Sequence, residues 1–119
     1  MADIAWLVLF TGMLSVGQLL FKRVGLLMHG RPLQEGVWLV LASPALYLSL
    51  ALYALATALW IWILSRIPLS QAYPWVGVGV VLVPLLARFF YGEKVTLTFW
   101  VGALLVAVGI VVTQYGAGE

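Results

Sequence analysis

The sequence predicts an all-α membrane protein with four transmembrane helices and a short interfacial helix before the second of them. Of the 119 residues, 65% are hydrophobic and 8% are charged, and the mean hydropathy is +1.13. Soluble domains carry about 25% charged residues, and about 20 apolar residues suffice for one span. The uncharged runs cover 4–21, 36–65, 67–87 and 95–118. We therefore expect a single four-helix transmembrane domain over residues 1–119, without a soluble domain.

Helix 1 is expected over about 3–22, and one of its faces is polar. Its clearly polar side chains are Thr11, Ser15 and Gln18, and with Lys22 they are spaced four, three and four residues apart. At about 100° per residue this spacing places all four on one side of a helix, which we call the polar stripe. Lipid would leave these groups without hydrogen-bond partners, so the polar stripe is expected to face protein or a cavity.

The polar stripe allows two interpretations. It can line a cavity, and because it contains no Asp or Glu, the ligand would be an anionic head group rather than a cationic drug. Alternatively, each group serves the fold itself. Thr and Ser can bond back to carbonyl groups one turn earlier, Gln18 can join two helices, and Lys22 can extend to the membrane surface.

The segment 33–42 is too polar at its start to lie deep in the bilayer. We interpret it as an interfacial helix with Trp38 at head-group depth. Ser43-Pro44 has the residue types of an N-cap and a first helical position, so helix 2 is expected over about 44–65. The alternative is one long tilted helix from Gly36, kinked at the proline.

Helix 3 is expected over about 70–91, and it contains two prolines and two glycines: Pro74, Gly77, Gly79 and Pro84. Such residues free carbonyl groups that neighbouring helices must satisfy, so we expect this helix to be buried and bent. Gly92 ends it, and helix 4 is expected over about 96–115 with Thr96 as N-cap.

Small residues in helix 4 predict a dimer interface. Gly102 and Gly109 lie seven residues apart, with Ala103 and Ala107 alongside. Small residues let membrane helices approach closely and drive their association. The alternative is packing inside one subunit, but four short helices enclose little, which favours the dimer.

The basic residues are distributed unevenly across the predicted membrane. With four spans, both termini and the loop near Arg66 share one side, which has that single basic residue. The other side has five: Lys22, Arg23, Arg31, Arg88 and Lys94. The positive-inside rule therefore predicts that these loops are cytoplasmic and that both termini are outside.

Three of these cations predict a phosphate-binding site. Lys22 and Arg23 end helix 1, and Arg88 lies one turn before Gly92 at a similar level. A phosphodiester there would accept charge-assisted hydrogen bonds. Glu93 would neutralise the cations when the site is empty, or carry a proton. Alternatively, the cations anchor helix ends at the membrane surface, and Glu93 compensates the dipole of helix 4 or forms an ion pair.

Other kinds of site are close to excluded. The chain has no cysteine, and His29 is its only histidine, so neither a disulfide framework nor a protein-built metal site is expected. A net charge of +2 is too small to imply a nucleic-acid partner. No cofactor is expected.

Several features resemble the small multidrug resistance transporters. They are the four short spans, Lys22 at the end of helix 1, Gly77-Val78-Gly79 and the Gly102/Gly109 spacing. That family works as an antiparallel dimer, in which a helix-1 glutamate eight residues before the lysine exchanges protons for cations. The equivalent position here is Leu14, so the residue that couples protons to cations in that family is absent.

The sequence is more similar to another branch of the drug/metabolite transporter superfamily. This branch comprises the small EamA-like subunits that flip undecaprenyl-phosphate-linked aminoarabinose for lipopolysaccharide modification. The similar segments are 14–18 (LSVGQ) followed by Lys22, 65–74 (SRIPLSQAYP), Gly92-Glu93 and 100–102 (WVG). The resemblance covers nearly the whole chain. It implies movement of a glycosylated polyprenyl phosphate between the leaflets of the bacterial inner membrane.

We therefore expect a flippase for an undecaprenyl-phosphate-linked monosaccharide, working as a homodimer or with a similar small subunit. Lys22, Arg23 and Arg88 would hold the phosphate, with Glu93 beside them. Polar side chains from both ends of the bundle would contact the sugar: Ser15, Gln18, Ser70, Gln71 and Tyr73. Two other functions stay open. One is a proton-coupled exporter of small cations that uses Glu93, and the other is a non-transporting subunit that assembles a glycosyltransferase.

Overall fold

The structure, a computed structural model, describes residues 2–117. These residues form α1 (Ala2–Leu26), α2 (Leu33–Leu41), α3 (Pro44–Leu64), α4 (Leu69–Ala72), the 3₁₀ helix η1 (Tyr73–Gly77), α5 (Val78–Tyr91) and α6 (Leu97–Ala117). Four segments are long and apolar enough to cross a membrane: Asp3–Leu26, Pro44–Leu64, Leu69–Tyr91 and Leu97–Gly116. The predicted class, an all-α membrane protein with four spans, is confirmed.

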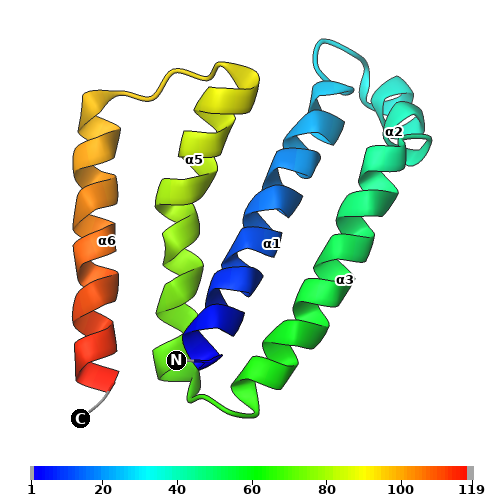
Figure 1. Cartoon of the computed structure of the whole chain (residues 1–119). Helices are drawn as coiled ribbons and strands as arrows, with labels where there is room; N and C mark the ends of the chain where they lie inside the picture. Colours follow the sequence, from blue (N-terminus) through cyan, green and yellow to red (C-terminus); the bar gives the residue numbers. More distant parts are fainter. Residues whose placement is uncertain (1, 118–119) are drawn as a thin grey trace.

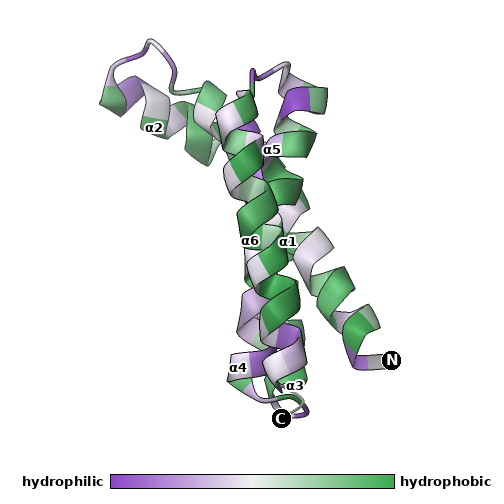
Figure 2. Ribbon diagram, turned by 90° about the vertical axis from the view of Figure 1, so that its left-hand side faces the viewer, coloured by the Kyte–Doolittle hydropathy of each residue, from purple (hydrophilic) through white to green (hydrophobic). Residues whose placement is uncertain are grey.

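The long helices form a single layer. Figure 1 shows them side by side in the order α6, α5, α1 and α3, so α1 lies between α5 and α3. Seen along the layer, in Figure 2, α5 and α6 largely overlap, and α1 is tilted so that its N-terminal end lies to one side of them. The principal extents are 53 × 36 × 20 Å, so the chain is flattened in one direction. Such a layer leaves both of its broad faces open.

The best-packed part of the layer is the contact between α1 and α3. A buried cluster joins them near the N-terminus of α1: Leu7, Phe10, Ala56, Ile63, Ile67 and Ala72. Towards the other end, Gly17 lies against the ring of Tyr53, and a Cβ atom added to Gly17 would be 2.4 Å from that ring. The Tyr53 ring stacks on Phe21 with 4.9 Å between centroids. A larger residue at position 17 would therefore have to displace the Tyr53 ring.

The separate short helix predicted before the second span is confirmed, and its interfacial position stays a prediction. α2 ends at Leu41, and α3 begins at Pro44, with the extended backbone of Ser43 between them. The two helices are separate, so the alternative of one long kinked helix is wrong. Figure 2 shows α2 projecting sideways from one end of the layer, across the direction of the long helices. Trp38 is 68% exposed on it, and its depth in the head-group region stays a prediction.

The third span is interrupted as its prolines and glycines predict, but it is not buried. η1 separates α4 from α5, with Pro74 in its first turn. Within α5, which the structure describes in full, no residue is fully buried, and Phe89 and Phe90 are 81% and 63% exposed. The expectation of burial is wrong for the single chain, because a one-layer arrangement covers α5 only at its two edges.

Candidate functional site

The five basic residues outside the α3–α4 turn lie in or beside the α1–α2 and α5–α6 connections, at the upper end in Figure 1. We call this the basic end. A cavity of about 750 Å³ opens there between α1, α5 and the segment that leads into α6. Its polar lining residues are Gln18, Lys22, Glu93, Lys94 and Thr96. We call it the Lys22 cavity.

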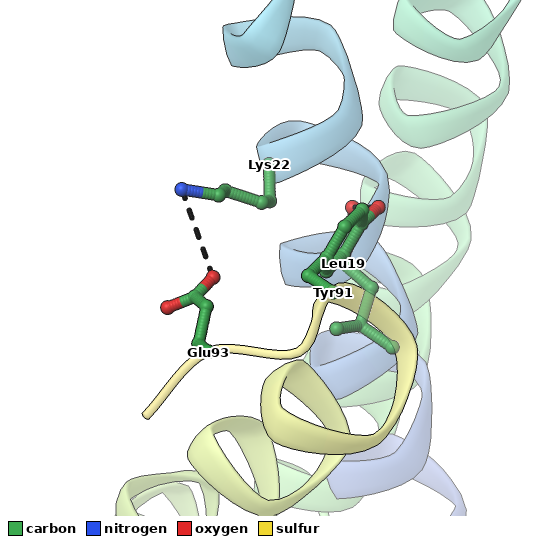
Figure 3. A network of polar contacts seen from close by, with 4 residues as sticks. All are labelled: Leu19, Lys22, Tyr91 and Glu93. Carbon is green, nitrogen blue, oxygen red and sulfur yellow. Dashed lines mark hydrogen bonds and ion pairs between the residues drawn. The ribbon is translucent and has the colours of Figure 1, made fainter. Parts of the chain in front are cut away.

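An ion pair lies at the Lys22 cavity. Lys22 Nζ is 3.6 Å from Glu93 Oε2, and the two side chains are 47% and 44% exposed (Figure 3). An ion pair between half-exposed groups contributes about 0–1 kcal/mol. A ligand phosphate can therefore replace the carboxylate of Glu93 on Lys22 at small energetic cost, and the lysine is neutralised before and after the exchange.

Two local features bring Glu93 to Lys22. Gly92 ends α5 in the left-handed conformation, with φ of +65°, which glycine adopts without a steric penalty. The Tyr91 hydroxyl donates a hydrogen bond of 2.8 Å to the carbonyl oxygen of Leu19, which attaches the end of α5 to α1 (Figure 3). The chain reverses directly after this contact, so Glu93 returns beside the next turn of α1.

The polar stripe continues from the Lys22 cavity towards the middle of the bundle. A neighbouring cavity of about 440 Å³ is lined by Thr11 and Ser15, and the two cavities share Gln18, Val83, Pro84 and Phe99 as lining residues. The stripe therefore faces the groove between α1 and α5. These two cavities and the Lys22–Glu93 pair form the candidate site.

The hydrogen bonds of the polar stripe also match its ordinary structural interpretation. The hydroxyls of Thr11 and Ser15 donate to the carbonyl oxygens of Leu7 and Thr11, at 2.8 and 2.9 Å. Gln18 Nε2 donates to the hydroxyl of Tyr53 on α3, at 2.7 Å. Thr11 and Ser15 are 5% and 1% exposed, whereas Gln18 and Lys22 are exposed. The latter two are thus the members of the stripe that a ligand can reach in this conformation.

The three cations of the predicted phosphate site are not brought together. Arg23 lines a separate cavity of about 520 Å³, on the side of α1 that faces the start of α3. Arg88 lines a recess with Glu93 and Lys94, next to the Lys22 cavity but not in it. Consecutive helical residues point about 100° apart, which is why Lys22 and Arg23 reach different neighbours.

The predicted sugar contacts are split between the two ends of the membrane. Ser70 lies in α4 and is exposed, and Tyr73 begins η1 and is 62% exposed. The carbonyl oxygen of Gln71 accepts a hydrogen bond of 3.0 Å from Gln114 Nε2 of α6. The whole span Leu69–Tyr91 separates these residues from Glu93. One head group held by Lys22 therefore cannot touch them at the same time.

The small residues of α6 fall on two faces. Ala103 is 3% exposed, and Ala107 is half-buried and lines an open cavity with Trp75 of η1 and Ile110. At Gly102 and Gly109, an added Cβ would have no neighbour within 4 Å. The alanines therefore pack within the subunit, whereas the two glycines lie on an open face of α6.

Tyr53 and Tyr91 are residues of the site that the sequence analysis did not predict. Each hydroxyl joins a neighbouring helix to α1, through Gln18 and the Leu19 carbonyl respectively. A buried or half-buried tyrosine within a span needs a partner for its hydroxyl. From the sequence, this requirement could have marked both tyrosines as hydrogen-bonded, but it could not have identified the groups that they contact.

Comparisons with known proteins agree with the resemblance predicted from the sequence. A model of the EamA-like transporter family matches residues 3–115. The chain is 36% identical over 107 residues to a protein of Aeromonas hydrophila named probable 4-amino-4-deoxy-L-arabinose-phosphoundecaprenol flippase subunit ArnE, over 90% of this chain and 92% of the relative. A protein of Enterobacter sp. with the same name is 39% identical over 106 residues, over 88% and 91% of the two chains. No solved structure matches the chain.

Proposed function

This chain belongs to the EamA-like transporter family, and we propose that it is a subunit of a flippase for an undecaprenyl-phosphate-linked monosaccharide. The relatives named as flippase subunits support aminoarabinose as the sugar. The direction of transport is from the cytoplasmic to the periplasmic leaflet of the bacterial inner membrane. The five basic residues at one end support a cytoplasmic location of that end, with both termini periplasmic.

The observation that carries this proposal is the Lys22–Glu93 pair beside an open cavity. The phosphodiester of the lipid displaces Glu93 from Lys22 and accepts charge-assisted hydrogen bonds. Lys94 lines the same cavity, and Arg88 lies next to Glu93 in the adjoining recess. When the lipid leaves, Glu93 pairs with Lys22 again, so the charged lysine is never left unpaired in the apolar surroundings.

The sugar follows the groove between α1 and α5, and the polyprenyl chain stays in the bilayer. Gln18 lines both cavities of this groove, so it is the first polar side chain beyond Lys22 that the sugar contacts. Ser15 and Thr11 lie deeper and become reachable only if α1 and α5 move apart. Ser70, Gln71 and Tyr73 belong to the exit at the opposite end.

A second subunit completes the transport path. One layer of helices, 20 Å in its smallest extent, cannot enclose a sugar phosphate on both sides. The open face of α6 that carries Gly102 and Gly109 suits close packing against another helix. The partner is a second copy or a similar small subunit, and Ala103 and Ala107 support this face from inside the chain.

Native mass spectrometry of protein extracted gently from its own membrane tests the proposal. Wild type is expected to retain a polyprenyl-phosphate glycolipid, whose mass identifies the sugar. Lys22→Met should lose it, because the substitution keeps the length of the side chain and removes its charge, whereas Lys22→Arg should keep it. Arg31→Met removes a charge from an exposed turn at the same end and serves as the control.

Other outcomes of that experiment lead elsewhere. Retention of the glycolipid by Lys22→Met would overturn the phosphate site. A dimer without glycolipid, combined with proton-dependent export of a quaternary ammonium dye, would favour the cation exporter. Retention of a glycosyltransferase in place of the lipid would favour an assembly subunit.

A further inference from the structure

The cavity that Arg23 lines lies outside the proposed transport path. It has a volume of about 520 Å³ and lies between the last turns of α1 and the first turns of α3. Its polar lining residues are Arg23 and Ser43, and the rest of the lining is apolar: Leu20, Leu27, Pro44, Ala45 and Leu48. None of these residues lines the Lys22 cavity. We call it the Arg23 cavity.

The charge at the Arg23 cavity is not neutralised within the described part of the chain. Residues 2–117 contain two ion pairs, Lys22 with Glu93 and Arg66 with Asp3. Arg23 takes part in neither of them. Ser43 occupies the N-cap position of α3, but its side chain forms no capping hydrogen bond. Both polar groups of the cavity therefore have hydrogen-bonding capacity left for a ligand.

The location of the Arg23 cavity selects an amphiphilic ligand. Its walls belong to two helices that are apolar enough to cross the membrane, and they lie at the ends of those helices, where the bilayer changes from acyl chains to head groups. α2 projects sideways at the same end (Figure 2). Its residues Leu33, Val37 and Trp38 are exposed, which is typical of a helix that lies on a membrane surface. A ligand here has its polar group beside Arg23 and its apolar part along the leucines.

We propose that the Arg23 cavity binds an anionic glycerophospholipid from the leaflet at the basic end. The guanidinium group forms two parallel hydrogen bonds with phosphate oxygens, a geometry that arginine favours. The Ser43 hydroxyl donates a third bond. The acyl chains follow Leu20 and Leu48 into the bilayer, because both lie deeper in their spans than Arg23 and Ser43. This lipid stays bound while substrate moves on the other side of α1, so the site is independent of the flippase activity.

Binding of defined lipids to the purified protein in detergent tests this inference without any transport. Native mass spectrometry is recorded while dioleoyl phosphatidylglycerol or dioleoyl phosphatidylcholine is added. Wild type should bind one phosphatidylglycerol molecule in preference to phosphatidylcholine. Arg23→Gln should weaken phosphatidylglycerol binding about tenfold, as expected for the loss of a charge-assisted hydrogen bond. Arg31→Gln, with the same charge change in an exposed turn, should change it less than about twofold.

Two further measurements separate a lipid site from a site for any phosphate ester. Ala45→Phe fills the apolar part of the cavity and keeps Arg23, so it should also weaken phosphatidylglycerol binding. Millimolar glycerophosphoglycerol, which has the head group without acyl chains, should not displace the lipid. Displacement by this soluble anion would overturn the lipid assignment. Equal weakening by Arg23→Gln and Arg31→Gln, or none by Arg23→Gln, would overturn the site.

Discussion

The two cavities on either side of α1 differ in how their charge is balanced. Lys22 and Arg23 are neighbours in the sequence, yet Lys22 pairs with Glu93 at 3.6 Å in one cavity and Arg23 lines the other beside Ser43. A cation paired with a carboxylate can exchange it for a substrate phosphate, and the carboxylate pairs with the cation again when the substrate leaves. An arginine without one favours continuous occupation by an anion. The difference suggests that consecutive basic residues serve transport and lipid anchoring respectively.

The largest expected effect is on transport, and it distinguishes the two cations. Lys22→Met should lower the rate at which labelled glycolipid leaves the cytoplasmic leaflet of membrane vesicles by about a hundredfold, because the phosphate loses its charged partner. Arg23→Met should lower it much less, since Arg23 lies outside the Lys22 cavity. Equal losses for both variants would show that the two cavities act as one site.

The next effect is on the packing of α1 against α3. Gly17→Val places methyl groups where the Tyr53 ring lies, because even a Cβ atom would be 2.4 Å from the ring. Such overpacking costs about 1–3 kcal/mol. The fraction of protein that stays monodisperse after heating in detergent, measured by size-exclusion chromatography, should fall. Gly12→Val is the matched control, because its added Cβ has no neighbour within 4 Å. Equal losses in both variants would contradict the packing explanation.

A smaller effect is expected when the Lys22 cavity loses its carboxylate, so that its cation has no ion-pair partner, as in the Arg23 cavity. Glu93→Gln removes the competitor for Lys22, so a phosphate-bearing lipid should bind more tightly and leave more slowly. Because a half-exposed pair contributes about 0–1 kcal/mol, the affinity should rise about two- to fivefold, with a matching fall in turnover. Measuring lipid retention and transport rate on the same preparation checks that retention rises while the transport rate falls. Weaker retention would show that Glu93 itself holds the substrate.

The smallest effect is expected at the opposite end of the layer. Arg66 Nε is 3.7 Å from Asp3 Oδ1, and the guanidinium lies 4.9 Å from the centre of the Trp62 ring. Both charged groups are about half exposed, so Arg66→Gln should destabilise the protein by less than about 1 kcal/mol. The same heating experiment should show a small change, and lipid binding at the basic end should be unaffected. A loss as large as that of Gly17→Val would show that this contact organises the bundle.

The sequence alone predicts much of the local structure. Uncharged runs predict the four spans, because a bilayer excludes charge over a known thickness. Ser43-Pro44 predicts the start of α3, and the polar start of 33–42 predicts the separate helix α2. The period of 3.6 residues predicts that Thr11, Ser15, Gln18 and Lys22 share a face. Each of these inferences depends on neighbours within one helix.

Burial of the third span is where this local reasoning failed. Prolines and glycines predict a broken helix, and η1 provides the break. They do not say how many helices surround it. In a single layer α5 has only α1 and α6 as long neighbours, so its faces stay open unless another subunit covers them.

By itself, the sequence determined the helices and the polar stripe, because hydrophobicity and periodicity act between residues close in the chain, and its motifs resembled those of the family. Only the tertiary structure decided which partners the charges have. Lys22 and Glu93 are 71 residues apart in the sequence. Glu93 reaches Lys22 because Gly92 reverses the chain and the Tyr91 hydroxyl attaches α5 to the Leu19 carbonyl. Arg23, one residue further along α1, turns by about 100° towards α3. Its different environment follows from which helix packs on which side of α1.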